Sequence, residues 1–184
     1  MISTSYKVAT VWGIPIKLHL SLLIIVFYFI HVTHSLVFGI LLEIGLATSI
    51  ILHELGHSLV AIKKGCRVRE ITLMCIGGAA QMEKIPTKPW DECLMAAAGP
   101  LVSLVLGLVL WFGATLPPFN LLGDQAILGL QLLGVINLWL VAFNMLPSFP
   151  MDGGRILRAA LTPKLGRLKA TFFAARLGKI LALG

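Results

Sequence analysis

The chain of 184 residues is 58% hydrophobic and only 12% charged, and its mean hydropathy of +0.93 is too high for a water-soluble core. This composition excludes a soluble domain and predicts a multi-pass integral membrane protein. The formal net charge of +7 does not point to nucleic acid, because the basic residues cluster in alternate loops between apolar stretches. The expected surrounding is therefore a lipid bilayer, and no nucleic acid is expected as a partner.

Four apolar stretches are long enough to cross a bilayer as helices, which takes about 20 residues. They cover residues 18–38, 39–62, 94–114 and 124–143. A fifth begins near Ala170 and is still apolar at the last residue, Gly184. We therefore expect an all-α polytopic bundle of about five to six transmembrane helices, the last one truncated or absent. Residues 1–184 are predicted to form one transmembrane domain that is truncated at its C-terminus.

The positions of the basic residues predict how these spans are oriented. Lysines and arginines are frequent in residues 63–88 and 155–169, whereas residues 31–39 and 115–123 contain none. Cytoplasmic loops carry an excess of lysine and arginine. The N-terminus, the loop of residues 63–90 and the segment after Leu146 are therefore predicted to be cytosolic.

The second predicted span carries three ionisable side chains, His53, Glu54 and His57, in the sequence HELGH. Moving such groups out of water is costly, so ionisable residues inside a span usually mark a functional site. Residues four apart lie on one face of a helix. Both histidines can therefore bind the same ion while Glu54 lies beside them, as in the HExxH metal motif. The alternative is a pair of structural histidines that bond to neighbouring helices.

The segment between the second and third spans, VREITLMCIGGAAQM, differs from the helical stretches. It is rich in β-branched residues, has alternating character, and is interrupted at Gly77 and Gly78. This pattern predicts strands, and thus a small membrane-associated β segment beside the helices.

Asp152 is the candidate for a third metal ligand, because a catalytic zinc takes three protein ligands and keeps its fourth position for water. It follows the fourth span in NMLPSFPMDGGR, where two prolines break the helix and Gly153 and Gly154 loosen the chain after Asp152. Such a turn can bend back toward His53, which lies about nine residues, or roughly 14 Å, from the cytosolic end of its helix. The alternative role of Asp152 is a helix N-cap.

With the three ligands on a metal, Glu54 is free to act as the general base of a peptide hydrolysis. Asn137 and Asn144 are seven residues apart, about 20° around the fourth span, and form a polar stripe. One or both could hold the substrate backbone or stabilise the oxyanion. Hydrogen bonds between helices are the alternative role for both. The ligand types favour zinc, although a His/His/Asp set can also bind other divalent ions.

With these residues, the sequence resembles the site-2 protease family of intramembrane zinc metalloproteases. HELGH and NMLPSFPMDGG are similar to the two signature elements of that family and occur in the same order. GIPIKLH, IGGAAQME and AAAGPLVSLVLG also resemble family segments, so the resemblance covers most of the chain. The paired signature elements are specific, whereas the glycine-rich segments alone would be weak.

The resemblance implies one zinc ion per chain, bound by His53, His57 and Asp152, with Glu54 as catalytic residue and Asn144 as a substrate-positioning residue. It also implies that the second, third and fourth spans form a core around the zinc. The implied activity is regulated intramembrane proteolysis of transmembrane protein substrates, with the active site toward the cytosolic side. A regulatory domain or partner that this chain does not contain is a further expectation.

An open edge of the predicted strands could pair with an unwound substrate as an added strand. Gly77 and Gly78 are therefore candidate substrate-binding residues. A cytosolic hairpin that only joins two helices is the alternative for this segment.

Two other functions use similar residues. Intramembrane histidines and carboxylates also mark the ion pathways of metal or proton transporters. Transporters are commonly built from internal repeats, and none is evident in this sequence. An inactive metal-binding scaffold is the second alternative, but a scaffold has no need for Glu54.

Overall fold

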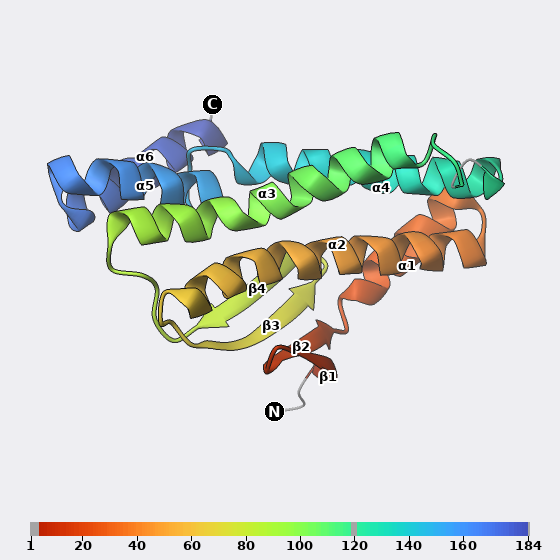
Figure 1. Cartoon of the computed structure of the whole chain (residues 1–184), viewed down its shortest axis with the longest axis horizontal. Helices are drawn as coiled ribbons and strands as arrows, with labels where there is room; N and C mark the ends of the chain where they lie inside the picture. The colour runs from red at the N-terminus through yellow and green to blue at the C-terminus, as the bar shows by residue number, and fades with distance from the viewer. Residues whose placement is uncertain (1–3, 119–120, 184) are drawn as a thin grey trace.

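The computed structural model describes residues 4–118 and 121–183, in which one small sheet lies beside a group of helices. Figure 1 shows α2 (Leu36–Lys63) in the middle of the molecule. Helices α3 (Pro89–Gly113) and α4 (Asp124–Asn144) lie along one side of α2, and the sheet covers the other side. The HELGH segment of α2 is therefore enclosed between the sheet and the other long helices.

Within the described part of the chain, α2, α3 and α4 are the three helices long and apolar enough to cross a membrane. They correspond to the second, third and fourth predicted spans. Each of these helices extends beyond its predicted range by a few residues at one end or both. The prediction of a mostly helical chain with a small sheet is confirmed at this level.

The prediction of a single helix over residues 18–38 is wrong. This stretch holds the end of a strand, helix α1 (Leu22–Thr33) and the start of α2. His34 takes a left-handed conformation with φ of 50°, and the Ser35 hydroxyl accepts a hydrogen bond from the Phe38 backbone N–H at 3.3 Å. These two residues end α1 and cap α2. With 12 residues, α1 is shorter than the about 20 that a helical span needs.

The fifth apolar stretch corresponds to helix α6 (Arg167–Leu183), which has 17 residues and is preceded by a separate helix, α5 (Asp152–Leu165). Gly166, with φ of 76°, separates the two. Helices α5 and α6 pack against each other, and α5 also packs against α3. Figure 1 shows both helices at the end of the molecule where α3 begins.

The sheet contains the predicted strands β3 (Val68–Met74) and β4 (Gly77–Met82), which pair antiparallel. It also contains an unpredicted hairpin, β1 (Ser5–Val11) and β2 (Ile14–His19), whose turn has positive φ at Trp12 and Gly13. Strand β2 pairs parallel to β3, which gives the order β1-β2-β3-β4. Strand β3 is therefore internal, and the open edge expected in this segment belongs to β4.

One face of the sheet packs against α2 through a cluster of buried aliphatic side chains. The cluster comprises Ile14, Ile16, Leu22, Ile50, Leu55, Ile71 and Leu73. Burying one such side chain contributes about 1.5–3 kcal/mol relative to leaving it exposed. This packing holds β4 beside the HELGH segment.

Candidate metal centre

Three buried side chains meet where α5 begins. The Nε2 atoms of His53 and His57 are 3.1 Å apart, and they lie 3.3 Å and 3.1 Å from Asp152 Oδ2. A tetrahedral ion with bonds of about 2.0–2.1 Å separates its ligand atoms by about 3.3 Å. The three atoms therefore surround a space that fits zinc. No other group of three or more potential metal ligands occurs among the residues that the structure describes.

The outer nitrogens of both rings have their own partners, which aim the inner nitrogens at the centre. His57 Nδ1 lies 2.7 Å from the Met95 carbonyl oxygen, and His53 Nδ1 lies 2.9 Å from the Ser103 hydroxyl. A carbonyl only accepts hydrogen bonds, so His57 Nδ1 carries a proton, and in the neutral ring its Nε2 presents a lone pair. Such outer partners fix the orientation of metal-binding histidines. A convergence of lone pairs of this kind favours a cation at the centre.

Asp152 is the first residue of α5, and Met151 occupies the N-cap position. No side-chain capping bond is made there, so the alternative role of Asp152 as an N-cap does not apply. Burial alone would raise the pKa of the Asp152 carboxyl, but its contacts with His53 and His57 outweigh burial and lower the pKa below its ordinary value. The carboxyl group is therefore available as an anionic ligand.

The expectation that Gly153 and Gly154 loosen the chain is wrong. Both glycines are buried in the first turn of α5. A Cβ on Gly153 would overlap the Met145 carbonyl oxygen, and one on Gly154 would lie 2.6 Å from the Ser148 carbonyl oxygen. The pair thus lets α5 pack tightly onto the loop that precedes it, which fixes Asp152.

Gly99 of α3 has a similar role on the other side of the centre. A Cβ on Gly99 would overlap His57 Nε2 and lie 2.8 Å from His53 Nε2. Only a residue without a side chain allows α3 to approach both rings this closely.

A cavity of about 430 Å³ opens beside the three candidate ligands. Glu54 lines it together with Asn144 and Arg155, and β4 forms one wall through residues 78–80 and Met82. A Cβ on Gly78 would lie 2.8 Å from Glu54 Cγ, so this glycine allows β4 to lie directly against the glutamate. Gly77 lines a smaller adjoining cavity, which Glu54 and Asn144 also line.

The structure brings Asn144 to the cavity but not Asn137. The Asn144 side-chain amide donates one hydrogen bond to the Leu140 carbonyl, at 2.9 Å. Asn137 is fully buried and donates to the Ser49 hydroxyl of α2 and the Leu133 carbonyl, both at 2.9 Å. Asn137 thus makes the contact between helices that was its alternative role, and its position does not favour a substrate-binding role.

Gly99, Ser103, the Met95 carbonyl and Arg155 were not expected at the site from the sequence. The first three are spaced four residues apart on α3, which places them on one face. That spacing, which begins at Met95 and continues into AAAGPLVSLVLG, was the signal available for them. Arg155 follows Asp152 by three residues and therefore lies on the same side of α5.

Replacing Ser103 with alanine should weaken zinc binding by about tenfold, because outer partners of metal-binding histidines contribute 10–100-fold to affinity. A competition titration against a chelator would measure this. Ser58 provides a matched control, since its hydroxyl is also fully buried but has no hydrogen-bond partner. Ser58→Ala should leave the zinc affinity within about twofold, and an equal loss in both variants would remove the assigned role of Ser103.

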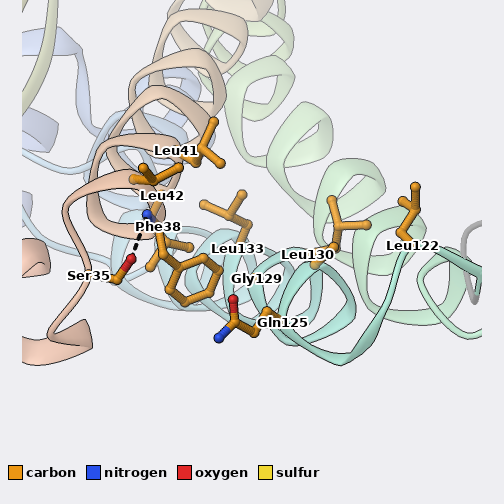
Figure 2. A pocket seen from close by; sticks show the side chains of 11 residues that line it. Ser35, Phe38, Leu41, Leu42, Leu122, Gln125, Gly129, Leu130 and Leu133 are labelled. Atoms are coloured by element: carbon orange, nitrogen blue, oxygen red, sulfur yellow. Dashed lines mark hydrogen bonds between the residues drawn. The ribbon is translucent and has the colours of Figure 1, made fainter.

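A second cavity, of about 470 Å³, lies near the other end of α2. Figure 2 shows that it is lined mainly by leucines and by Phe38, at the start of α2 and along α4. Its lining contains no histidine, cysteine, acid or base. This cavity therefore offers no group for metal binding or proton transfer, and the candidate site is the one beside Asp152.

A comparison with known proteins identifies the family of this chain. The family model for peptidase family M50 matches residues 41–129 and 120–184. The chain belongs to peptidase family M50. This membership, together with a match to a solved site-2 protease structure, confirms the resemblance to that family.

Similar proteins include metalloproteases of Methanocaldococcus jannaschii and Synechocystis. The M50 chain is 44% identical to a zinc metalloprotease of Methanocaldococcus jannaschii over 97% of its own length and 52% of that protein. It is 43% identical to a putative zinc metalloprotease of Synechocystis over 78% of its length and 37% of that protein. The chain thus spans about half, or less, of these curated relatives.

The solved structure supports the same relationship. The M50 chain matches a site-2 protease from Methanocaldococcus jannaschii with a TM-score of 0.73 and 43% identity. The match covers 97% of this chain and 82% of the other. The fold of the described residues is therefore that of a site-2 protease.

Proposed function

We propose that this chain is an intramembrane zinc metalloprotease that hydrolyses peptide bonds in or near the transmembrane segment of membrane-anchored proteins. The main support is the meeting of His53, His57 and Asp152 beside Glu54 in one cavity between apolar helices. Membership of peptidase family M50 supports the same reaction. The relatives from Methanocaldococcus and Synechocystis are named as zinc metalloproteases, which supports zinc as the metal.

The proposal assigns three roles to residues of this cavity. His53, His57 and Asp152 hold the zinc, which when bound supplies a Lewis acid for the scissile carbonyl and the attacking water. Glu54 takes a proton from the water and then delivers it to the nitrogen of the leaving amine. Asn144 donates a hydrogen bond to the substrate backbone from its remaining amide N–H.

The cytosolic side is the proposed side of the active site. The basic segments, at the end of α2, the start of α3 and the turn between α5 and α6, gather at one end of the long helices in Figure 1. His57 lies six residues before the end of α2 at that same end. Basic residues favour the cytosolic face.

The test of this function uses the purified chain in proteoliposomes with single-span reporter proteins that differ in helix-breaking residues. We expect cleavage in or next to the apolar span, loss of cleavage after a zinc chelator, and recovery when zinc is returned. Mass spectrometry of the fragments locates the cut. Cleavage confined to soluble segments, or cleavage that resists complete zinc removal, would contradict the proposal.

The edge of β4 is the proposed binding site for an unwound substrate segment. Strand β4 pairs with β3 on one side and begins with Gly77 and Gly78. It lines the same cavity as Glu54. A substrate added as a further strand would place its peptide bonds next to the candidate metal centre.

Proline substitutions in β4 test this binding mode, because proline removes a backbone N–H. Backbone N–H groups of successive residues point to opposite sides of a strand. One of the two variants Ala79→Pro and Ala80→Pro therefore removes an N–H on the open edge of β4, and the other removes an N–H that faces β3. The open-edge variant should cleave at least about tenfold more slowly with unchanged zinc content, whereas Val8→Pro on the other edge strand should not. Wild-type cleavage by both β4 variants would rule out strand addition.

A further inference from the structure

Helix α3 carries the contacts that orient the candidate ligands, and they form a single stripe. Glu92, Met95, Gly99 and Ser103 are spaced by three, four and four residues, which places them on one face of the helix. Met95 and Ser103 hold the two rings, and Gly99 allows the rings to approach. Glu92, at the start of the stripe, pairs with arginines of the C-terminal helices and not with the histidines.

Glu92 is a buried carboxylate with only 2% of its surface exposed. It accepts hydrogen bonds from Nε of Arg158, at 2.9 Å, and from Nη2 of the same guanidinium group. Nη2 of Arg167 lies 3.5 Å from its other oxygen. A buried carboxylate is costly unless it is paired, so these contacts tie the start of α3 to both C-terminal helices.

Arg158 connects this pair to the metal centre. It lies on α5 six residues after Asp152, and its guanidinium carbon is 4.8 Å from the centre of the Phe149 ring. Phe149 belongs to the loop that leads into Asp152. Arg158, a residue of the helix that begins with Asp152, therefore contacts both the loop before this candidate ligand and Glu92 of α3.

We propose that Glu92 is a positioning residue for the metal centre. Helix α3 packs against α2, which carries the histidines, and against α5, which carries Asp152. Through Arg158, Glu92 fixes α5 on α3 and so sets the distance between the Asp152 carboxylate and the two rings. The inference rests on the metal binding in the proposed function but adds a residue outside the cavity.

The test compares zinc affinity in detergent for the wild-type chain, Glu92→Gln and Asp91→Asn, by competition against a chelator. Asp91 is the matched control: it is adjacent, undergoes the same chemical change, and pairs with Lys64 of α2 at 2.6 Å instead of with α5. We expect the zinc Kd to rise about tenfold in Glu92→Gln and to stay within about twofold in Asp91→Asn.

Three further variants test whether the effect of Glu92 acts through Arg158. Arg158→Met should raise the Kd as Glu92→Gln does, and the double variant should be no weaker than either single one, because both remove the same contact. Arg158→Lys keeps a charge beside Glu92 but loses the paired donors, so it carries the test if Glu92→Gln does not fold. Its Kd should also rise, by less than tenfold.

The outcomes separate this inference from the proposed function. A folded Glu92→Gln with a lower thermal midpoint but a wild-type zinc Kd would show that the pair is merely structural and overturn the inference. If Arg158→Lys must carry the test, a wild-type Kd in that variant would overturn it equally. A wild-type chain that binds no zinc would instead contradict the proposed function itself.

Discussion

Replacing Glu54 with glutamine should slow peptide hydrolysis by about 10²- to 10⁴-fold, the contribution typical of a general base. Glutamine keeps the size of the side chain but cannot take a proton from the attacking water. Zinc content should be unchanged, because the three candidate ligand atoms belong to other residues. Cleavage rate and zinc stoichiometry, measured on the same preparation, check both expectations.

Glu43 is the matched control for this variant. It is likewise a glutamate of α2, but it is buried, with 7% exposure, whereas Glu54 is half-buried, and it lines a different cavity, toward the start of the helix. Glu43→Gln should cleave within about twofold of the wild-type rate. Wild-type cleavage by Glu54→Gln would remove Glu54 as the base, and loss of its zinc would mean that Glu54 is itself a ligand.

Replacing Gly99 with alanine should lower zinc affinity by more than about 100-fold and abolish cleavage. The added methyl group would overlap His57 Nε2 and crowd His53 Nε2, so α3 and the rings must move apart. Geometry within about 0.5 Å is needed for such a site to function. A chelator titration and the reporter cleavage assay measure the two losses.

Gly113 controls for the effect of alanine itself on α3. A Cβ at this position meets no atom within 4 Å, and alanine favours a helix over glycine by about 1 kcal/mol. Gly113→Ala should therefore keep wild-type zinc affinity and cleavage. Zinc affinity that survives in Gly99→Ala would show that the rings do not depend on the close approach of α3.

The candidate ligands could be predicted because their signals are local. The spacing of His53 and His57 is a property of any helix, and both lie in an apolar stretch where ionisable groups are costly. Asp152 could be found because it follows a span end with a helix break. The structure brings these three together as the sequence predicted, and their role as zinc ligands stays a prediction for the metal and cleavage measurements.

Features that depend on three-dimensional packing could not be predicted. Gly99 and Ser103 lie on another helix, and nothing in a hydropathy pattern relates them to the histidines. The β1-β2 hairpin was missed because its turn, at Trp12 and Gly13, is defined by positive φ, a conformation that a tryptophan does not signal in a sequence. The helix break at His34 was missed for a related reason, since a left-handed backbone at one residue does not change the hydropathy of the run around it.

The direct test of the central claim is the elemental metal content of the detergent-purified chain, measured beside Asp152→Ala. The account predicts close to one zinc per wild-type chain and a marked loss of zinc in the variant. Folded wild-type protein without bound metal, or equal zinc in both proteins, would contradict a centre that His53, His57 and Asp152 form together.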